Sequence, residues 1–299
     1  MLQAISPRHD AHHERRRKNS LASLTASLQD SKKHLLLAAS GSVATIKLPL
    51  IIESLAKRHA ERDSSKELSI RVLLTPSATR FLAGQSREQP PVSSLLSMPC
   101  VDGVYTDADE WKEPWKRGDS ILHIELRRWA DLLVIAPLSA NTMAKIVGGF
   151  ADGILTSVVR AWDAWGDLDS DPAAAPDGEQ ALANGNSRRK QKKLILVAPA
   201  MNTAMWRHPV TAKSLRVLEE EWGANRSARK AAPVVTEEEG QAAEEQKKDT
   251  ASTAEDDGGW FEVLRPQSKA LACGDVGDGA MMDWRDIVAV IEERLGLDE

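Results

Sequence analysis

Four short polar segments each follow an apolar run, and their side chains are of types that bind small polar ligands. They are Ser40-Gly41-Ser42-Val43, Thr75-Pro76-Ser77-Ala78, Pro137-Leu138-Ser139-Ala140-Asn141-Thr142 and Pro199-Ala200-Met201-Asn202. Gly41 would let the backbone approach a ligand closely, and the N–H groups of a following helix, with the Ser42 hydroxyl, suit a phosphate. The hydroxyls and amide of 139–142 suit a flavin edge or a sugar, and the Asn202 amide suits a carboxylate or an amide. Taken singly, the first segment favours a plain turn and helix cap, being neither a dinucleotide fingerprint nor a P-loop, and the second is evenly balanced between a cap and a ligand. Capping could use one of the three polar side chains of 139–142, so these favour a ligand, as does the position of Asn202 at a strand end.

Two further residues have side chains that could transfer protons. His123 lies at the start of a predicted helix over 124–130, with Arg127 and Arg128 one turn further on, so we expect cationic surroundings that could hold a substrate carboxylate. Cys273 lies in the glycine-rich segment 271–281, which we expect to form no regular element. A glycine-hinged flap that carries a thiol over a site is one interpretation. A loop with a buried cysteine is the alternative.

Apolar runs over 34–40, 68–75, 130–136 and 194–198 are the elements that must position these residues. Helical patterns lie between them. Continuous apolar strands that alternate with helices predict an α/β protein whose parallel sheet is covered on both faces. Ligands of open α/β sheets bind beyond the carboxyl ends of the strands, so we expect the four polar segments to meet at one site.

Composition limits the classes of function. Hydrophobic residues make up 42% of the chain and charged residues 28%, which is enough for a real core, while the net charge of −5 argues against a nucleic-acid binder. The two cysteines are too few for a disulfide framework or a zinc cluster, so we expect no metal site and a cytoplasmic location. A basic run at 15–18 makes a nuclear address the alternative. No apolar run reaches the roughly 18 residues of a membrane span, so no membrane partner is expected.

Three segments are expected to lie outside the core. Residues 1–33 are polar and irregular and predict a disordered N-terminal tail, followed by one domain over 34–299. Within that domain we expect disordered inserts at about 167–193 and 237–257, and the second insert holds nine acids and two lysines. Neither insert has an apolar face to bury.

Four stretches together resemble one family: GSVATIK at 41–47, LHIELRRWADLLVIAPLSANTMAKI at 122–146, PAMNTAMW at 199–206 and LACGDVGDGAM at 271–281. The chain resembles the phosphopantothenoylcysteine decarboxylase branch of the homo-oligomeric flavin-containing cysteine decarboxylases, over about 34–165, 194–235 and 260–290. This resemblance implies a flavodoxin-like (Rossmann-like) three-layer sandwich, bound FMN, and a homotrimer with sites between protomers. It also implies decarboxylation of 4′-phosphopantothenoyl-L-cysteine to 4′-phosphopantetheine in coenzyme A biosynthesis.

The resemblance further assigns roles to individual residues. His123 would be the catalytic base, Cys273 the proton donor, and Asn202 the group that binds the substrate carboxylate. The substrate would be clamped by Ala270, Leu271 and Ala272. Position 270 departs from the family, which has a basic residue directly before Leu-Ala-Cys; here that position is alanine and the lysine is one residue earlier, at 269. FMN would be bound by Gly41, Ser42, Val43, Thr75, Ser77, Ser139, Ala140, Asn141, Thr142 and Ala200.

Two other functions stay open. Some fungal relatives of this family act as regulatory subunits that inhibit a Ser/Thr protein phosphatase, and the acidic segment 237–257 keeps a protein-binding role possible. Enzymes of the coenzyme A pathway are further candidate partners. A different flavodoxin-like flavoprotein, such as an electron carrier or a prenyl-transferring enzyme, is the second alternative, but it would need neither the histidine nor the flap cysteine.

Overall fold

The computed structural model describes residues 20–28, 30–62, 67–166, 168, 192–224, 259–270 and 276–297. Its main sheet has six strands, all parallel, in the order β3-β2-β1-β4-β5-β6. The strands are β1 (Lys33–Ala39), β2 (Leu68–Leu74), β3 (Val101–Thr106), β4 (Leu132–Leu138), β5 (Leu194–Pro199) and β6 (Phe261–Val263). The order is that of Rossmann-type sheets, and it reverses direction between β1 and β4, where such sheets bind ligands.

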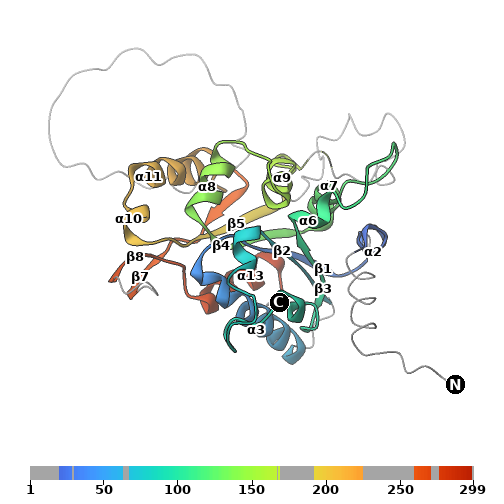
Figure 1. Cartoon of the computed structure of the whole chain (residues 1–299), viewed down its shortest axis with the longest axis horizontal. Helices are drawn as coiled ribbons and strands as arrows, with labels where there is room; N and C mark the ends of the chain where they lie inside the picture. The colour runs from blue at the N-terminus through green and yellow to red at the C-terminus, as the bar shows by residue number, and fades with distance from the viewer. Residues whose placement is uncertain are drawn as a thin grey trace, which may run out of the picture.

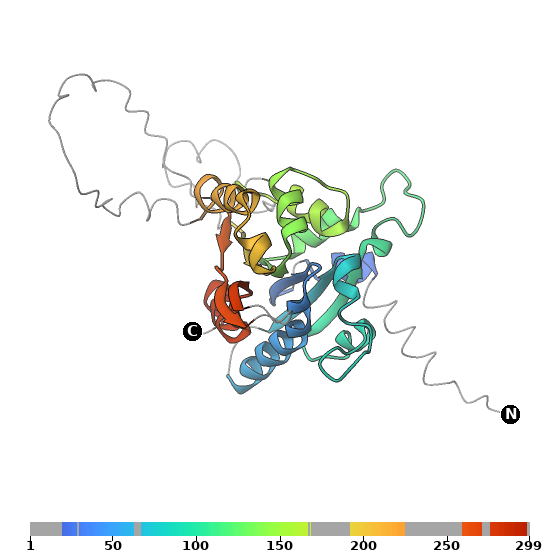
Figure 2. The same cartoon turned by 60° about the vertical axis from the view of Figure 1, so that its left-hand side comes forward.

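Helices cover both faces of this sheet (Figure 1). One face is covered by α3 (Leu48–Glu61) and α13 (Trp284–Leu295), which lie side by side in Figure 2. The other is covered by α2 (Leu21–Ala26), α7 (Leu122–Trp129), α8 (Ala140–Val147), α9 (Ile154–Arg160) and α11 (Pro209–Arg216). The flavodoxin-like (Rossmann-like) three-layer class predicted from the sequence is confirmed.

The continuous apolar runs follow from this arrangement. In β1, Leu35 and Leu37 belong to the core under α3, whereas Leu36 and Ala38 belong to the core on the opposite face. A strand buried on both faces favours apolar residues at most positions, because successive side chains point to opposite sides; the buried Ser69 and Arg71 of β2 are exceptions that have hydrogen-bond partners. All residues of β2 and β4 are accordingly buried.

Short elements connect the strand ends to the longer helices. They are η1 (Val43–Lys47), α4 (Pro76–Thr79), α5 (Val92–Leu95), α6 (Asp107–Glu110), α10 (Thr203–Trp206) and η3 (Val217–Glu221). A separate antiparallel pair is formed by β7 (Gln267–Ala270) and β8 (Val276–Ala280). Within the described ranges, no helix combines the length and apolar character that a bilayer crossing requires.

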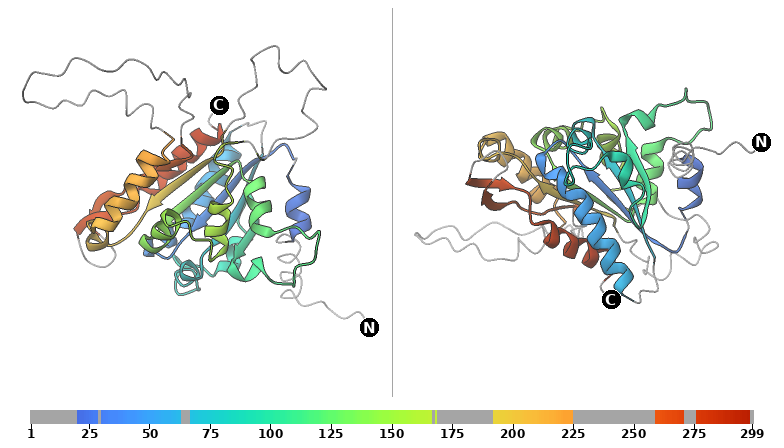
Figure 3. Two further views of the ribbon diagram at one scale, coloured as in Figure 1. Left: turned by 90° about the horizontal axis from the view of Figure 1, so that it is seen from above. Right: turned by 60° about the horizontal axis from the view of Figure 1, so that its bottom comes forward.

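Two expectations about the elements need correction. The tail expected over 1–33 holds α2 and the first residue of β1, and Leu24 of α2 is fully buried. Figure 3 shows α2 beside α7, and the Ser20 hydroxyl caps α2 by accepting the Ser23 N–H at 3.1 Å. The segment 271–281 was expected to hold no regular element, but 276–280 form β8. Most of the insert at 167–193, all of that at 237–257 and residues 1–19 lie outside the described residues.

Candidate active site at the carboxyl edge of the sheet

A cavity of about 660 Å³ opens beyond the carboxyl ends of β1, β4 and β5. It lies at the point where the strand order reverses, as the rule for open α/β sheets predicts. Its wall brings together most of the residues that the sequence suggested for binding, namely Gly41, Ser42, Val43, Ser77, Ser139, Ala140, Asn141, Ala200 and Asn202. Segments far apart in the chain therefore do meet at one site.

Ser40 forms hydrogen bonds between β1 and β4, the two strands between which the order of the sheet reverses. It is fully buried, its hydroxyl donates to the Pro137 carbonyl oxygen at 3.0 Å, and it accepts the Ser139 N–H at 2.7 Å. The Ser40 backbone N–H also donates to the Pro137 carbonyl oxygen, at 3.0 Å. These bonds fix the loop after β1 against the loop after β4.

Helix capping, the alternative interpretation of the polar segments, also applies. Ser42 accepts the Ala44 N–H at 3.4 Å, and Asn202 Oδ1 accepts the Met205 N–H at 2.8 Å. The Asn202 cap orients the amide, because its oxygen is bound and Nδ2 is left as the donor. Since Asn202 is exposed and lines the cavity, this donor is available to a ligand.

Two predicted binding residues lie behind the wall rather than in it. Thr75 Oγ1 caps α4 by accepting the Ala78 N–H at 3.3 Å and lies 3.2 Å from Ser77 Oγ. Thr142 is 5% exposed, and its Oγ1 accepts a hydrogen bond from Ser139 Oγ at 3.2 Å. Both threonines therefore position a neighbouring serine that does line the cavity.

Glycine is required at position 41 because the backbone there lies very close to the Ser77 side chain. A Cβ atom at this position would lie 2.5 Å from Ser77 Oγ and 2.6 Å from Ser77 Cβ. The loop after β1 can therefore approach α4 this closely only with glycine at position 41. Gly41, Ser42 and Ser77 thereby form a narrow polar cradle in the cavity wall.

The strand β8 closes the opposite side of the cavity. The Met201 N–H donates to the Gly279 carbonyl oxygen at 3.0 Å, and Arg207 forms an ion pair with Asp278 at 2.8 Å. Side chains at Gly277 and Gly279 would overlap Thr203 Oγ1 and the Met201 carbonyl oxygen. The glycines therefore serve close packing in a strand, which is why the expectation of an irregular segment was wrong. Ala270 ends β7, and Leu271, Ala272 and Cys273 lie outside the described residues.

Several apolar residues of the wall were missed in the sequence. Met201, Met205 and Met281 lie in stretches that carry the family resemblance, but the sequence did not assign them to the site, because side chains of this kind reach the cavity through tertiary packing. The missed residues are Phe81, Met201, Met205, Met281, Met282 and Trp284, and the cation Lys47 joins them. Together they give the cavity an extended apolar surface beside its polar cradle.

His123 lies apart from this cavity, on α7 next to α6. In Figure 1, α6 and α7 lie on the side of the molecule away from α10 and β8. His123 Nδ1 is 2.7 Å from Glu110 Oε1, and the guanidinium of Arg128 is bound to Glu125 at 3.3 Å. The group that contacts His123 is therefore a carboxylate, which the expectation of cationic surroundings from Arg127 and Arg128 did not include.

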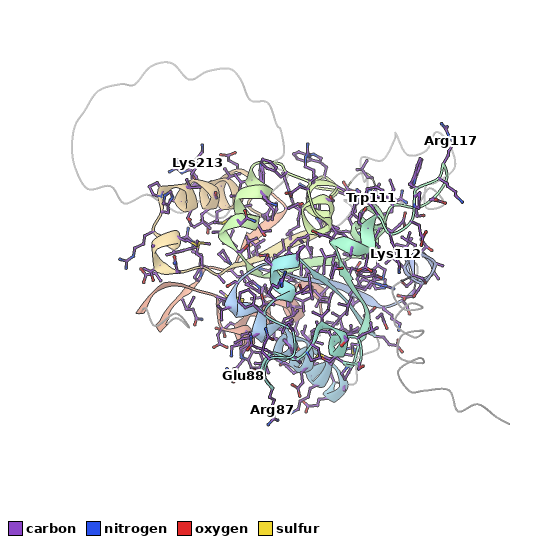
Figure 4. All side chains as sticks on the ribbon, viewed as in Figure 1. Arg87, Glu88, Trp111, Lys112, Arg117 and Lys213 are labelled. Atoms are coloured by element: carbon purple, nitrogen blue, oxygen red, sulfur yellow. The ribbon has the colours of Figure 1, made fainter. Side chains whose placement is uncertain are left out.

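Two exposed tryptophans follow Glu110, the residue that contacts His123. Trp111 and Trp115 are 64% and 52% exposed. Figure 4 shows Trp111 and Lys112 directly after α6, at the outer surface. Both tryptophans line a hollow of about 890 Å³, together with Ile121 and charged residues such as Lys112 and Asp119. Large aromatic side chains exposed beside polar ones are compatible with a contact surface.

Comparison with known proteins identifies the family. The model of the family described as Flavoprotein matches residues 23–296. The chain belongs to the Flavoprotein family. This flavoprotein is 35% identical to "Probable thymidylate synthase" of Schizosaccharomyces pombe over 272 residues. The aligned residues make up 91% of this chain but only 31% of that protein. It is also 32% identical over 273 residues to Coenzyme A biosynthesis protein 3 of Saccharomyces cerevisiae, and this alignment covers 89% of this chain and 34% of that protein. The chain thus spans about a third of the length of these two fungal relatives.

A plant relative matches over most of both chains. This is the phosphopantothenoylcysteine decarboxylase of Oryza sativa subsp. japonica, 36% identical over 253 residues, which cover 85% of this flavoprotein and 76% of the relative. Solved structures also match, and two of them are similar over most of the chain. One is a cysteine-to-serine mutant of PPC decarboxylase complexed with pantothenoylaminoethenethiol, with a TM-score of 0.54, 33% identity and coverage of 90% of this chain and 100% of that one. The other is the FMN-binding protein AtHal3, with a TM-score of 0.50, 34% identity and coverage of 88% and 96%.

Proposed function

We propose that this flavoprotein decarboxylates 4′-phosphopantothenoyl-L-cysteine to 4′-phosphopantetheine with the help of FMN, as a step of coenzyme A biosynthesis. The observation that carries the proposal is the cavity at the strand-order reversal, whose wall holds the polar cradle at one end and Asn202 at the other. The decarboxylase relative in rice and the FMN-binding structural neighbour support the reaction and the cofactor.

The residues present fit FMN. A volume of about 660 Å³ lies within the roughly 300–1,000 Å³ of ordinary ligand sites. The close approach at Gly41, with the N–H groups beyond Ser42 and Val43, suits the phosphate, and Ser77 adds a hydroxyl. Ser139, Ala140 and Asn141 would hold the ring edge, Ala200 would line the ring, and the apolar wall would cover its face. Bound FMN supplies a reversible acceptor for two electrons.

The chain's own groups would bind the substrate and move its protons. Asn202 Nδ2 would donate to the substrate carboxylate, because Oδ1 is committed to the Met205 N–H. His123 would take the thiol proton, and Cys273 would return a proton at the end. Ala270, Leu271 and Ala272 would clamp the substrate.

A homotrimer would complete the site. His123 does not line the cavity of its own chain, so a second copy would have to supply it. Exposed apolar residues occur at both places: Trp111 and Trp115 beside His123, and Val43 (46% exposed) and Met205 (51% exposed) at the cavity. These surfaces support contacts between copies in a closed cyclic oligomer. Light scattering of the purified chain should give the mass of three copies.

The decisive experiment combines the purified full-length chain with FMN and the substrate, and measures the product by mass spectrometry. We expect yellow protein that forms phosphopantetheine. His123→Asn should lose decarboxylation and keep FMN, whereas the exposed His208→Asn, which retains a cap for α11, should behave as the parent protein. Cys273→Ser should accumulate the oxidised enethiol intermediate. Protein that cannot be loaded with FMN would refute the proposal, and normal turnover by His123→Asn would remove that residue from it.

The same purified protein can distinguish the decarboxylase from the alternative function, a regulatory subunit that inhibits a Ser/Thr phosphatase. His123, Asn202 and Cys273 occur together in one chain, which favours the enzyme. Inhibition of a Ser/Thr phosphatase without any product formation would favour the regulator instead. A cytoplasmic location is also proposed, on the basis of the cysteine content, and imaging of a tagged chain would distinguish it from a nuclear one.

A further inference from the structure

The single turn α6 is fixed on two sides. At its start, Asp109 Oδ2 accepts the Thr106 N–H and the Thr106 hydroxyl, each at 2.9 Å. Asp107 Oδ1 accepts the Ile154 N–H at 3.0 Å, which ties α6 to the start of α9. The last residue of this anchored turn is Glu110, so its backbone position is determined by contacts that do not involve His123.

The Glu110 carboxylate is directed at His123. Its side chain is 5% exposed, and Oε1 lies 2.7 Å from His123 Nδ1. Its other oxygen, Oε2, is buried and has no hydrogen-bond partner among the described residues. A buried carboxylate without a partner is costly, so His123 is the group that stabilises this charge.

This pairing distinguishes the two ring nitrogens. A carboxylate can only accept hydrogen bonds, so the bonded Nδ1 must carry a hydrogen. The second nitrogen, Nε2, has no hydrogen bond within the described part of the chain, and the His123 side chain is 20% exposed. The nitrogen left to accept a proton is therefore Nε2.

We propose that Glu110 is a positioning residue for His123, which holds the hydrogen on Nδ1 and presents Nε2 as the basic nitrogen. The inference rests on the proposed function, in which His123 takes a proton from the substrate. Glu110 itself touches no substrate in this scheme. It stabilises the ring orientation, and also the imidazolium formed when Nε2 accepts a proton.

The kinetic test compares Glu110→Gln in two backgrounds of the full-length, FMN-loaded chain. In the parent background we expect kcat to fall by about 100-fold, at the low end of what general acid–base catalysis contributes, with KM and FMN content unchanged. In a His123→Gln background the same change should leave the residual rate unchanged, because Glu110 acts through His123; this slow rate is followed by mass spectrometry in long incubations at high enzyme concentration. The matched control is Glu113→Gln, an exposed carboxylate of the following loop. Parent-like kcat in Glu110→Gln, or additive losses, would overturn the proposal.

A second measurement does not depend on turnover. In protein with ¹⁵N-labelled histidine, assigned by His123→Gln, the neutral His123 ring should show a protonated Nδ1 and an unprotonated Nε2, and this pattern should change in Glu110→Gln. A neutral parent ring protonated at Nε2 would refute the assignment. If the parent chain fails to decarboxylate the substrate, the proposed function falls, while this spectrum still decides the relationship between Glu110 and His123.

Discussion

The Ser139 N–H donates to the Ser40 hydroxyl at 2.7 Å, across the two strands between which the order of the sheet reverses. The same hydroxyl donates to the Pro137 carbonyl oxygen, so one buried side chain after β1 satisfies two main-chain groups at the end of β4. Because Ser139 also caps α8 and lines the cavity, the geometry of the site depends on this contact.

Replacing Ser40 by alanine should therefore weaken both the fold and the site. The buried Ser139 N–H would lose its partner, which costs about 1–3 kcal/mol of unfolding free energy. Urea denaturation should show this loss, and flavin fluorescence should show weaker FMN binding. The exposed Ser93→Ala is a suitable control. Unchanged stability in Ser40→Ala would mean that the loops are held by other contacts.

Gly41→Ala should reduce the affinity for FMN because the new Cβ would lie 2.5 Å from Ser77 Oγ. Overpacking of this kind costs about 1–3 kcal/mol, which corresponds to a rise in Kd of roughly 5- to 150-fold. Removing the opposing side chain with Ser77→Gly should recover part of the loss. If the double variant binds FMN no better than Gly41→Ala, steric overlap with Ser77 is not the cause.

The two β8 glycines should respond differently to second-site changes. Alanine at 277 would meet the Thr203 side chain, whereas alanine at 279 would meet the Met201 main chain. Both variants should lose turnover as β8 is displaced, and each should unfold more easily by about 1–3 kcal/mol. Thr203→Ala should restore activity only to Gly277→Ala, as measured by product formation. Equal rescue of both variants would contradict this packing.

Cys100 should react slowly with alkylating agents. Burial, with a smaller contribution from Asp102, raises the pKa of its thiol, so less thiolate is present at neutral pH than for an ordinary cysteine of pKa about 8.5. In Cys273→Ser, the iodoacetamide rate should lie below that of the urea-unfolded chain at the same pH and should increase as the pH is raised. A folded-state rate equal to the unfolded one would contradict the raised pKa.

The central strands could be predicted because burial on both faces leaves a continuous apolar run. In β3 that run is broken by Asp102 and Gly103, whose roles depend on other strands. Asp102 accepts the Ser69 hydroxyl at 2.6 Å, and a Cβ at Gly103 would lie 3.0 Å from Nη1 of Arg71 on β2. Neither contact can be inferred from local sequence, and this is why β3 was missed.

The polar half of the site could be predicted for a general reason, namely that loops after parallel strands meet at one edge. Its apolar half could not, since Phe81 and Trp284 reach the cavity only through packing. The surroundings of His123 were predicted from neighbours on its own helix. The residue that contacts it, Glu110, is 13 positions away and belongs to another element.

The cavity wall has a consequence for biogenesis. Residues 279–284 form one side of it, while Gly41 and Ser42 form another, so the two ends of the domain must both be present before a ligand can be enclosed. A chain still emerging from the ribosome can assemble most of the sheet but cannot yet shield a bound flavin from solvent. The moment at which protected flavin fluorescence appears during synthesis would therefore report when β8 packs against the rest of the cavity wall. A variant in which β8 cannot pack there would give a folded protein without bound flavin.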